Sequence, residues 1–172
     1  MTKGSRGETM PAAIGQELVG LLPRLRRFAL VLCRSPSLAD DLVQSACERA
    51  LAGADSWTPG TRLDAWVFRI LRNQWIDHLR RSRTEGMSED ITERPDIVGD
   101  AGEGPILSKL LLAEVQQFID TMPAEQREVL LLVCVEDLAY REAAEVLGVP
   151  IGTVMSRLAR ARKRLAEMTA AA

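Results

Sequence analysis

The chain has 172 residues, and its 22 Lys and Arg nearly balance its 24 Asp and Glu, so the formal net charge is −2. Hydrophobic residues make up 47% of the sequence, a globular composition that excludes a disordered or collagen-like chain. The length allows one ordinary domain or two small ones. Taken over the whole chain, the charge and a pI of about 5.6 argue against a uniformly basic nucleic-acid binder.

The sequence lacks the residue patterns of membrane, secreted, metal-binding and catalytic proteins. No stretch approaches the run of about 20 apolar residues that a membrane helix requires, and residues 1–15 lack the hydrophobic region of a signal peptide, so we expect a cytoplasmic protein without membrane insertion. His78 is the only histidine, and the sequence has no GxxxxGK loop or GxSxG elbow. We therefore predict no catalytic residue, no metal and no cofactor. The three cysteines form no CxxC pair and are predicted to be small buried side chains: Cys33, Cys47 and Cys134.

The charge is segregated along the chain. Three segments each carry a net charge of +4: residues 1–34, 61–83 and 150–172. The other segments are acidic, with −3 for residues 35–60, −6 for residues 84–104 and −5 for residues 105–149. The net charge is therefore an average over basic and acidic blocks, and nucleic acid must be considered segment by segment.

Apolar periodicity predicts an all-α protein, since spacings of three and four recur and strand-like alternation is absent. A first helical pattern contains Leu18, Leu21, Leu22, Leu25, Phe28 and Ala29. Ser37 followed by Asp40 resembles a capping box and predicts a helix to about Ala52.

Thr61 with Asp64 predicts the start of another helix, which runs to about Arg83. Asn73 and Gln74 interrupt its apolar rhythm and indicate a break or bend. With residues 1–14 as a disordered tail, this gives a first helical domain over residues 15–83.

Residues 84–104 hold glycines, Pro95 and seven acids but few large apolar groups, which predicts a flexible acidic linker spanning roughly 25 Å. A second domain is predicted over residues 105–168. Its expected helices cover about 106–120, from Pro123 to about 135, about 138–147 and about 152–168. The expected architecture is thus two small helical domains joined by an acidic tether.

The last two predicted helices and the glycine-containing turn between them have the pattern of a helix-turn-helix. The final helix has a predicted core stripe of Ile151, Val154, Leu158, Ala161 and Leu165. Hydroxyl and guanidinium groups off that stripe can contact base edges and phosphates. The alternative is a solvated face whose arginines are favoured near a helix C-terminus. The turn, the stripe and the +4 charge together favour DNA.

The helix predicted over residues 63–83 carries a second basic face. At 100° per residue its members are Arg69, Arg72, Asn73, Ile76, Arg80 and Arg83. Trp57, Trp66, Phe68 and Trp75 are interleaved with them, and aromatic platforms beside a basic track suit an unstacked single strand. The alternative is that these rings belong to the core, which we expect for Trp66.

Both halves together resemble an extracytoplasmic-function (ECF, group IV) sigma factor of the sigma-70 family. The segments that carry the resemblance to region 2 are residues 39–44 and 59–73, and those that resemble region 4 are residues 122–130, 140–144 and 152–162. Other helix-turn-helix regulators share the outline of region 4, but the ordered pair of regions is highly specific.

The resemblance implies a promoter-specificity subunit that does no chemistry itself. It would bind core RNA polymerase through the β′ clamp helices and the β flap, recognise −10 and −35 elements, and help melt promoter DNA. The implied clamp contacts are Asp40, Asp41, Leu42, Gln44 and Ser45, where the family often has Glu in place of Ser45. Asp40 and Asp41 also suit the first turns of a helix for electrostatic reasons.

The resemblance further implies that region 2 holds the melted −10 strand, with a flipped base near Asn73. The candidates for −10 binding are Arg69, Arg72, Asn73, Trp75, Asp77, His78 and Arg80. Region 4 would bind the −35 element in duplex form, with Thr153, Met155, Ser156, Arg157, Arg160 and Lys163 as candidates. Some relatives have Arg in place of Met155, which implies a different −35 sequence.

An anti-sigma factor is a further partner that the resemblance implies. Rival hypotheses are a free-standing helix-turn-helix regulator, a sigma-like decoy that binds an anti-sigma factor, and, least favoured, an enzyme. The regulator would dimerise and bind duplex DNA without polymerase, and the decoy would ordinarily carry a receiver domain. The segregated charge predicts that an isolated sigma-like chain binds DNA poorly until polymerase arranges its basic faces.

Overall fold

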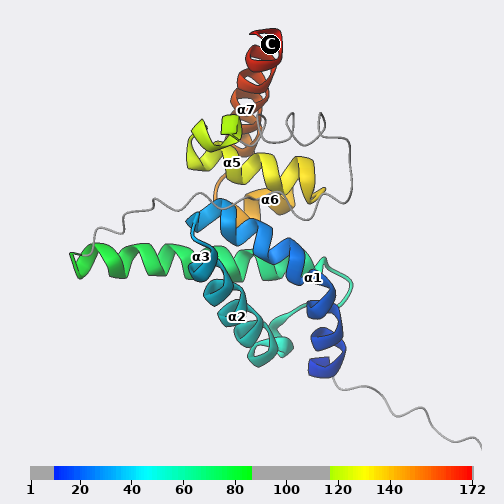
Figure 1. Ribbon diagram of the computed structural model, residues 1–172. Helices are drawn as coiled ribbons and strands as arrows, with labels where there is room; N and C mark the ends of the chain where they lie inside the picture. The colour runs from blue at the N-terminus through cyan, green and yellow to red at the C-terminus, as the bar shows by residue number, and fades with distance from the viewer. Residues whose placement is uncertain (1–9, 87–116, 172) are drawn as a thin grey trace, which may run out of the picture.

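The computed structural model describes residues 10–86 and 117–171, and the regular secondary structure of these residues is entirely helical (Figure 1). The predicted all-α class is confirmed. Apart from residues 84–86, the predicted linker lies outside the described residues, as does most of the helix expected over residues 106–120.

Three helices form the first half of the molecule: α1 (Met10–Cys33), α2 (Pro36–Ala52) and α3 (Leu63–Thr84). Their shared core includes Phe28 and Phe68, both fully buried, whose rings meet edge to face with centroids 5.2 Å apart. Small buried alanines on α2, such as Ala46, leave room for the larger side chains of α1 and α3. A short 3-10 turn, Ala54–Ser56, leads from α2 toward α3.

The first two helices begin elsewhere than the sequence patterns indicated. Helix α1 starts at Met10, inside the predicted tail, because Pro11 is tolerated in a first turn and Ile14 is already buried in the core. The N-cap of α2 is Ser35, not Ser37: the Ser35 hydroxyl accepts a hydrogen bond from the Leu38 amide at 3.5 Å. Pro36 then takes the first helical position, which its fixed φ favours.

Two further expectations for α3 are wrong. Thr61 does not cap the helix, because its hydroxyl donates to the Thr58 carbonyl at 2.6 Å and Arg62 is the N-cap residue. Nor does α3 break at Asn73 and Gln74, since the helix is continuous to Thr84. Gln74 is buried and donates to the Ser45 hydroxyl at 2.8 Å, so a polar side chain is accommodated inside the core without bending the helix.

The second half contains α5 (Ala124–Leu130), a π-helical segment (Leu131–Val135), α6 (Tyr140–Leu147) and α7 (Ile151–Ala171). Pro123 is the N-cap residue of α5 and not its first helical residue. The predicted helix-turn-helix is formed by α6 and α7. Gly148 ends α6 with φ +63°, a left-handed conformation that glycine adopts at little cost.

The π-helical segment ends in a second left-handed residue. The Glu136 amide donates to the Leu131 carbonyl at 2.9 Å, which widens the helix by one residue per turn. Asp137 follows with φ +55°. Together the wide turn and the reversal at Asp137 fix the direction in which the Glu136 side chain leaves the backbone.

We expect Asp137→Gly to be more stable than Asp137→Ala by about 1 kcal/mol, because a left-handed backbone places Cβ against the following carbonyl oxygen. Both variants remove the same carboxylate, so they differ only by a methyl group. Urea unfolding followed by circular dichroism would measure the difference. Equal stabilities would mean that Asp137 is not left-handed in solution.

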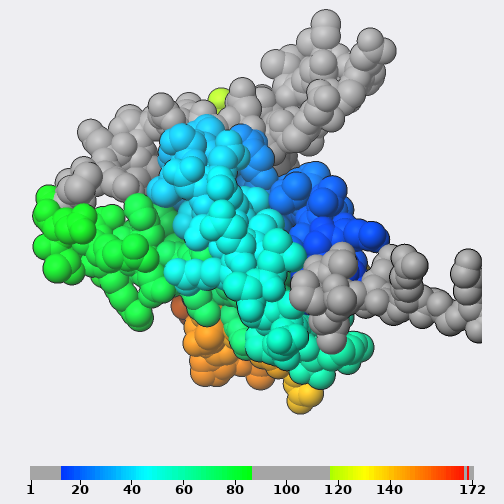
Figure 2. All heavy atoms as spheres, turned by 90° about the horizontal axis from the view of Figure 1, so that it is seen from below, coloured from blue at the N-terminus to red at the C-terminus, as the bar shows by residue number. Residues whose placement is uncertain are grey.

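The two halves pack against each other. Helix α6 lies against α3 (Figures 1 and 2), and α5 lies against α1 (Figure 1). Helix α7 projects away from the first half, so most of its surface faces solvent (Figure 1).

Candidate nucleic-acid interface

Helix α7 presents the predicted −35 residues on its outward face. Val154, Leu158 and Ala161 are buried toward α5 and α6, as the core stripe predicted, whereas Ile151 in the first turn is 45% exposed. The six candidates are exposed or half-buried: Thr153, Met155, Ser156, Arg157, Arg160 and Lys163. Their arrangement gives a basic, hydroxyl-bearing helix face of the kind that enters a major groove.

Arg162 lies on the same helix but is held differently. It is exposed, and hydrogen bonds with Cys134 and Tyr140 raise its pKa. These contacts tie α7 to the π-helical segment and to the start of α6. The prediction that Cys134 is buried is therefore wrong, because the wide π turn carries it to the surface; Cys33 is buried and Cys47 is half-buried.

The predicted −10 candidates all lie on α3, but they differ in accessibility. Arg69, Asn73 and Arg80 are exposed. Trp75 is only 6% exposed, and its ring stacks on His78 with centroids 5.6 Å apart. Trp75 therefore belongs to the core of the first half, and in this structure its ring is not open to a base. Asp77 and Arg80 form an exposed pair at 3.5 Å.

Arg72 is the −10 candidate that the second half covers. Its side chain is 16% exposed, and its Nε donates to Glu128 Oε2 on α5 at 2.8 Å. The basic face of α3 is thus divided, with Arg69 and Arg80 open to solvent and Arg72 closed by a carboxylate.

The predicted clamp contacts on α2 also include both exposed and buried residues. Asp40, Asp41 and Gln44 are exposed, and Asp40 accepts a hydrogen bond from Arg26 at 2.8 Å. Leu42 is 6% exposed and points into the core, while Ser45 is half-buried beside Gln74.

An apolar groove of about 700 Å³ lies between α1 and α2, beside the exposed candidates on α2. Its apolar lining includes Leu22, Val43, Cys47 and Leu51. Burial raises the pKa of the Cys47 thiol, so this side chain is a neutral part of the groove. The helical pattern does not reveal the groove, because Leu22 and Leu51 fit the apolar periodicity of α1 and α2 although each is 41% exposed.

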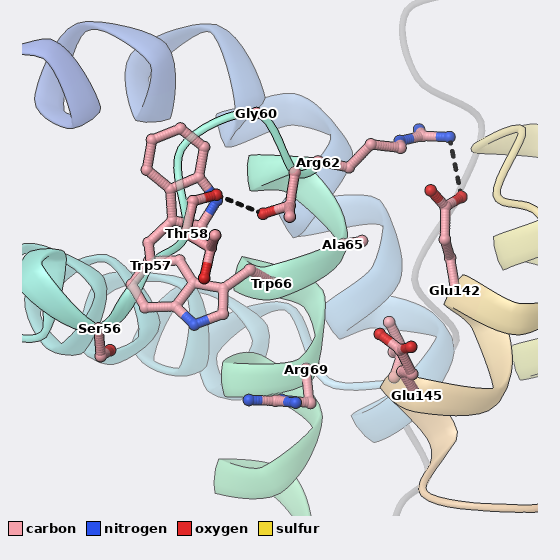
Figure 3. A pocket seen from close by; sticks show the side chains of 12 residues that line it. Ser56, Trp57, Thr58, Gly60, Arg62, Ala65, Trp66, Arg69, Glu142 and Glu145 are labelled. Carbon is pink, nitrogen blue, oxygen red and sulfur yellow. Dashed lines mark hydrogen bonds and ion pairs between the residues drawn. The ribbon is translucent and has the colours of Figure 1, made fainter.

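A second cavity, of about 450 Å³, lies between the two halves (Figure 3). Trp57, Trp66 and Arg69 line it from the first half, and Glu142 and Glu145 line it from α6. The indole nitrogen of Trp57 is buried and has no hydrogen-bond partner among the described residues.

Five ion pairs join the two halves, and one of them, Arg62–Glu142, lies between residues that line this cavity. The arginines come from α1, α3 and the turns that follow α1 and precede α3, and the carboxylates come from the second half. The pairs are Arg24–Glu136, Arg27–Glu136, Arg34–Asp120, Arg62–Glu142 and Arg72–Glu128. We call this set the arginine–carboxylate seam. Sequence reasoning missed it, because no local pattern pairs residues so far apart along the chain.

Asp64 anchors the seam from the side of the first half. It accepts hydrogen bonds from Arg24 at 2.7 Å and from Arg62 at 2.7 and 3.0 Å. Burial would raise the pKa of Asp64, but the hydrogen bonds from Arg62 and Arg24 outweigh it and lower the pKa from 3.8 to about 2. Asp64 therefore fixes two arginines that reach into the second half.

We expect the contribution of Asp64 to stability to be present above about pH 4 and lost as the pH falls toward 2. The lowered pKa corresponds to about 2 kcal/mol. Asp64→Asn should therefore unfold more easily than the wild type in urea at pH 7, and the difference should shrink near pH 2. Asp55→Asn, at an exposed aspartate, should stay within about 0.5 kcal/mol of the wild type. A constant difference at both pH values would contradict the ionised Asp64.

No helix in the described part of the chain is long and apolar enough to cross a membrane. Within the same residues, no group of three or more His, Cys, Asp or Glu side chains could hold a metal ion.

Comparison with protein families gives a match in each half of the chain. The family model described as Sigma-70 region 2 matches residues 19–85, and the model described as Sigma-70, region 4 matches residues 112–165. The chain is 35% identical over 156 residues to the ECF RNA polymerase sigma factor EcfG of Rhodopseudomonas palustris (strain TIE-1), covering 91% of this chain and 84% of the relative. The chain belongs to the ECF RNA polymerase sigma factors.

Other ECF sigma factors and solved structures agree. SigW of Bacillus subtilis (strain 168) is 31% identical over 74% of this chain and 73% of its own length. The sigma factor RpoE, solved in complex with the anti-sigma factor NepR from Bartonella quintana, is 35% identical with a TM-score of 0.74, covering 90% of this chain and 94% of that one. CnrH, solved in complex with the cytosolic domain of CnrY, is 26% identical with a TM-score of 0.64, covering 92% and 88%.

The family match gives the two halves of this ECF sigma factor their names. Region 2 comprises α1, α2 and α3, and region 4 includes α5, α6 and α7. Sigma factors are non-catalytic transcription initiation factors that give RNA polymerase its promoter specificity, so this chain is not an enzyme.

Proposed function

We propose that this ECF sigma factor directs core RNA polymerase to promoters whose −10 and −35 elements are recognised by α3 and α7, respectively. The observation that carries the proposal is the ordered pair of regions 2 and 4, with a basic outward face on α7. Thr153, Ser156, Arg157 and Arg160 contact −35 bases, and Lys163 contacts phosphate.

Region 2 has two tasks in this proposal. The exposed face of α2, with Asp41 and Gln44, binds the β′ clamp helices together with the neighbouring apolar groove, and region 4 binds the β flap. Arg69, Arg72 and Asn73 hold the melted −10 strand. A first domain from the start of α1 at Met10 to the end of α3 at Thr84, and a second over residues 105–168, would allow one chain to bridge both elements through the acidic linker between them.

Reconstitution with core RNA polymerase and a promoter library tests the proposal. We expect the protein to co-purify with core polymerase and to start transcription at a subset of promoters that share −10 and −35 sequences. Specific duplex binding by dimers without polymerase would favour a free-standing helix-turn-helix regulator. Absence of both co-purification and transcription would contradict a sigma factor.

We also propose that this chain is a cytoplasmic group IV factor held inactive by an anti-sigma factor. The similar sigma factor RpoE, solved in complex with the anti-sigma factor NepR, supports this. A purified anti-sigma candidate should form a stoichiometric complex with the chain and suppress reconstituted transcription. Transcription that is insensitive to every such complex would contradict this regulation.

A further inference from the structure

Helix α7 carries a row of exposed apolar side chains that does not belong to the core. Ile151, Met155 and Ala159 are spaced by four residues, so they follow one another along one side of the helix. Ile151 is 45% exposed, Met155 is 47% exposed, and Ala159 is also exposed. We call these three residues the apolar ridge. Burial inside the protein does not explain why these positions are apolar.

The apolar ridge borders the basic, hydroxyl-bearing face of α7. At 100° per residue, Ala159 lies about 40° from Met155 and about 60° from Ser156 around the helix axis. Ser156 and Arg160 are exposed and are also spaced by four residues, so they form a polar row parallel to the ridge. A partner that contacts the polar row therefore also meets Met155.

The charge around the ridge favours nucleic acid as that partner. Residues 150–172 carry a net charge of +4, and Arg160 and Lys163 are exposed beside the ridge. The phosphates on both sides of a major groove match this charge. A helix held between them brings its outward side chains to the base edges, so the apolar ridge is placed to enter the groove of a DNA duplex.

The major groove offers one methyl group to such a ridge, the C5-methyl of thymine, where cytosine has only a hydrogen atom. If Met155 lies against a donor or acceptor of a base, it displaces water without replacing the hydrogen bond, which costs free energy. Against the methyl group, the same side chain removes apolar surface of both partners from water. Met155 is therefore suited to thymine and poorly suited to the polar edges of the other bases.

The Ser156 hydroxyl is compatible with the adenine that pairs with thymine. Its proton is engaged, because Ser156 Oγ donates to the Thr153 carbonyl at 3.1 Å. The oxygen can still accept a hydrogen bond, and adenine presents an amino donor in the major groove. A T·A pair thus offers a methyl group to the apolar ridge and an amino group to an acceptor in the polar row.

We propose that the apolar ridge recognises the C5-methyl group of a thymine in the −35 element, and that Met155 is the residue that selects this base. Ile151 and Ala159 extend the apolar surface on either side of Met155. This inference rests on the proposed function, because it names a base that α7 recognises within the −35 duplex. The contact depends on shape and apolar surface, with no hydrogen bond to thymine.

Replacement of thymine by uracil tests the contact, because uracil lacks only the C5-methyl group. Selection from randomised −35 sequences with the reconstituted polymerase holoenzyme gives the preferred element, and each of its thymines, on either strand, is then replaced singly by deoxyuridine. At one position the wild-type holoenzyme should bind the uracil duplex about fourfold more weakly in a competition assay, the effect of burying about one methyl group. An element in which no uracil weakens binding would overturn the inference.

Three substitutions at exposed positions test whether the effect belongs to Met155. Met155→Gln keeps the length of the side chain but makes its end polar, so it should bind the thymine and uracil duplexes equally. Met155→Leu stays apolar and should retain the preference for thymine. Val135→Ala removes an exposed apolar side chain outside α7 and should keep the wild-type ratio of the two affinities. Undiminished discrimination by Met155→Gln would contradict the role of Met155.

The same experiment separates failure of the proposed function from failure of the thymine contact. A holoenzyme that selects no −35 motif would overturn the proposed function and the thymine contact with it. A clear motif whose uracil versions bind as tightly as the thymine versions would overturn the contact alone. If Met155→Gln weakened association with core polymerase but left the discrimination intact, the ridge would be a protein contact and not a reader of thymine.

Discussion

Phe68→Ala should destabilise region 2 by about 3–5 kcal/mol, the range for removing a fully buried aromatic side chain. The Phe68 ring is 0% exposed and meets the edge of Phe28 at 5.2 Å. The Arg24 guanidinium lies 5.6 Å from its centroid, so the ring also supports an arginine of the seam. Urea unfolding of the full-length chain, followed by circular dichroism, would give the change in the free energy of unfolding.

Two controls separate the role of the ring from a general effect of truncation. Phe68→Leu retains most of the apolar volume and should cost about 1.5 kcal/mol or less. Val19→Ala, on the 67% exposed Val19 of the same three-helix unit, should stay within about 0.5 kcal/mol of the wild type. A loss below about 1 kcal/mol for Phe68→Ala would contradict the packing of α1 against α3 described above.

Arg160→Ala should weaken binding of the reconstituted polymerase holoenzyme to its −35 element by about 1–3 kcal/mol and relax the preference at one base position. Arg160 is exposed on the outward face of α7, on the side opposite the buried Val154 and Leu158. Selection from a library of randomised −35 sequences, with and without the substitution, measures both effects.

Lys163→Ala is the comparison for a phosphate contact on the same helix. It should weaken binding by a similar amount on every −35 sequence and lower the slope of log affinity against log salt by about one. A uniform loss for Arg160→Ala would place Arg160 among the phosphate contacts. An unchanged affinity would remove it from the DNA interface.

Much of the fold was predictable because it depends on local patterns. The helix-turn-helix followed from a left-handed glycine at Gly148 and a stripe of spacing three and four on α7, and both features are contained within a few turns of chain. Helix starts were less predictable. Ser35 and Ser37 both suit an N-cap position, and packing of Leu38 and Ala39 decides between them.

The placement of the candidate site residues depended on tertiary contacts that no local pattern contains. The face of α3 was identified from its arginines, but sequence spacing could not reveal that Glu128 closes Arg72 while Arg69 stays open. Leu42 and Trp75 were both candidates for binding a partner, yet both side chains are buried in the core of the first half. Segment charges indicated the basic faces. They did not indicate that carboxylates of the acidic block over residues 105–149 would form ion pairs with those faces.

The π-helical turn at Leu131–Val135 gives the seam an unusual dependence on chain length. A π turn contains one residue more than an α-helical turn, so deleting a single residue there would let the segment continue as an ordinary α-helix. Every later position would then rotate by about 100° about the helix axis. Glu136 would then point away from Arg24 and Arg27, although Glu136 itself is unchanged. Among related chains, a gap of one residue at this place would therefore mark a sigma factor that has lost this junction between its regions.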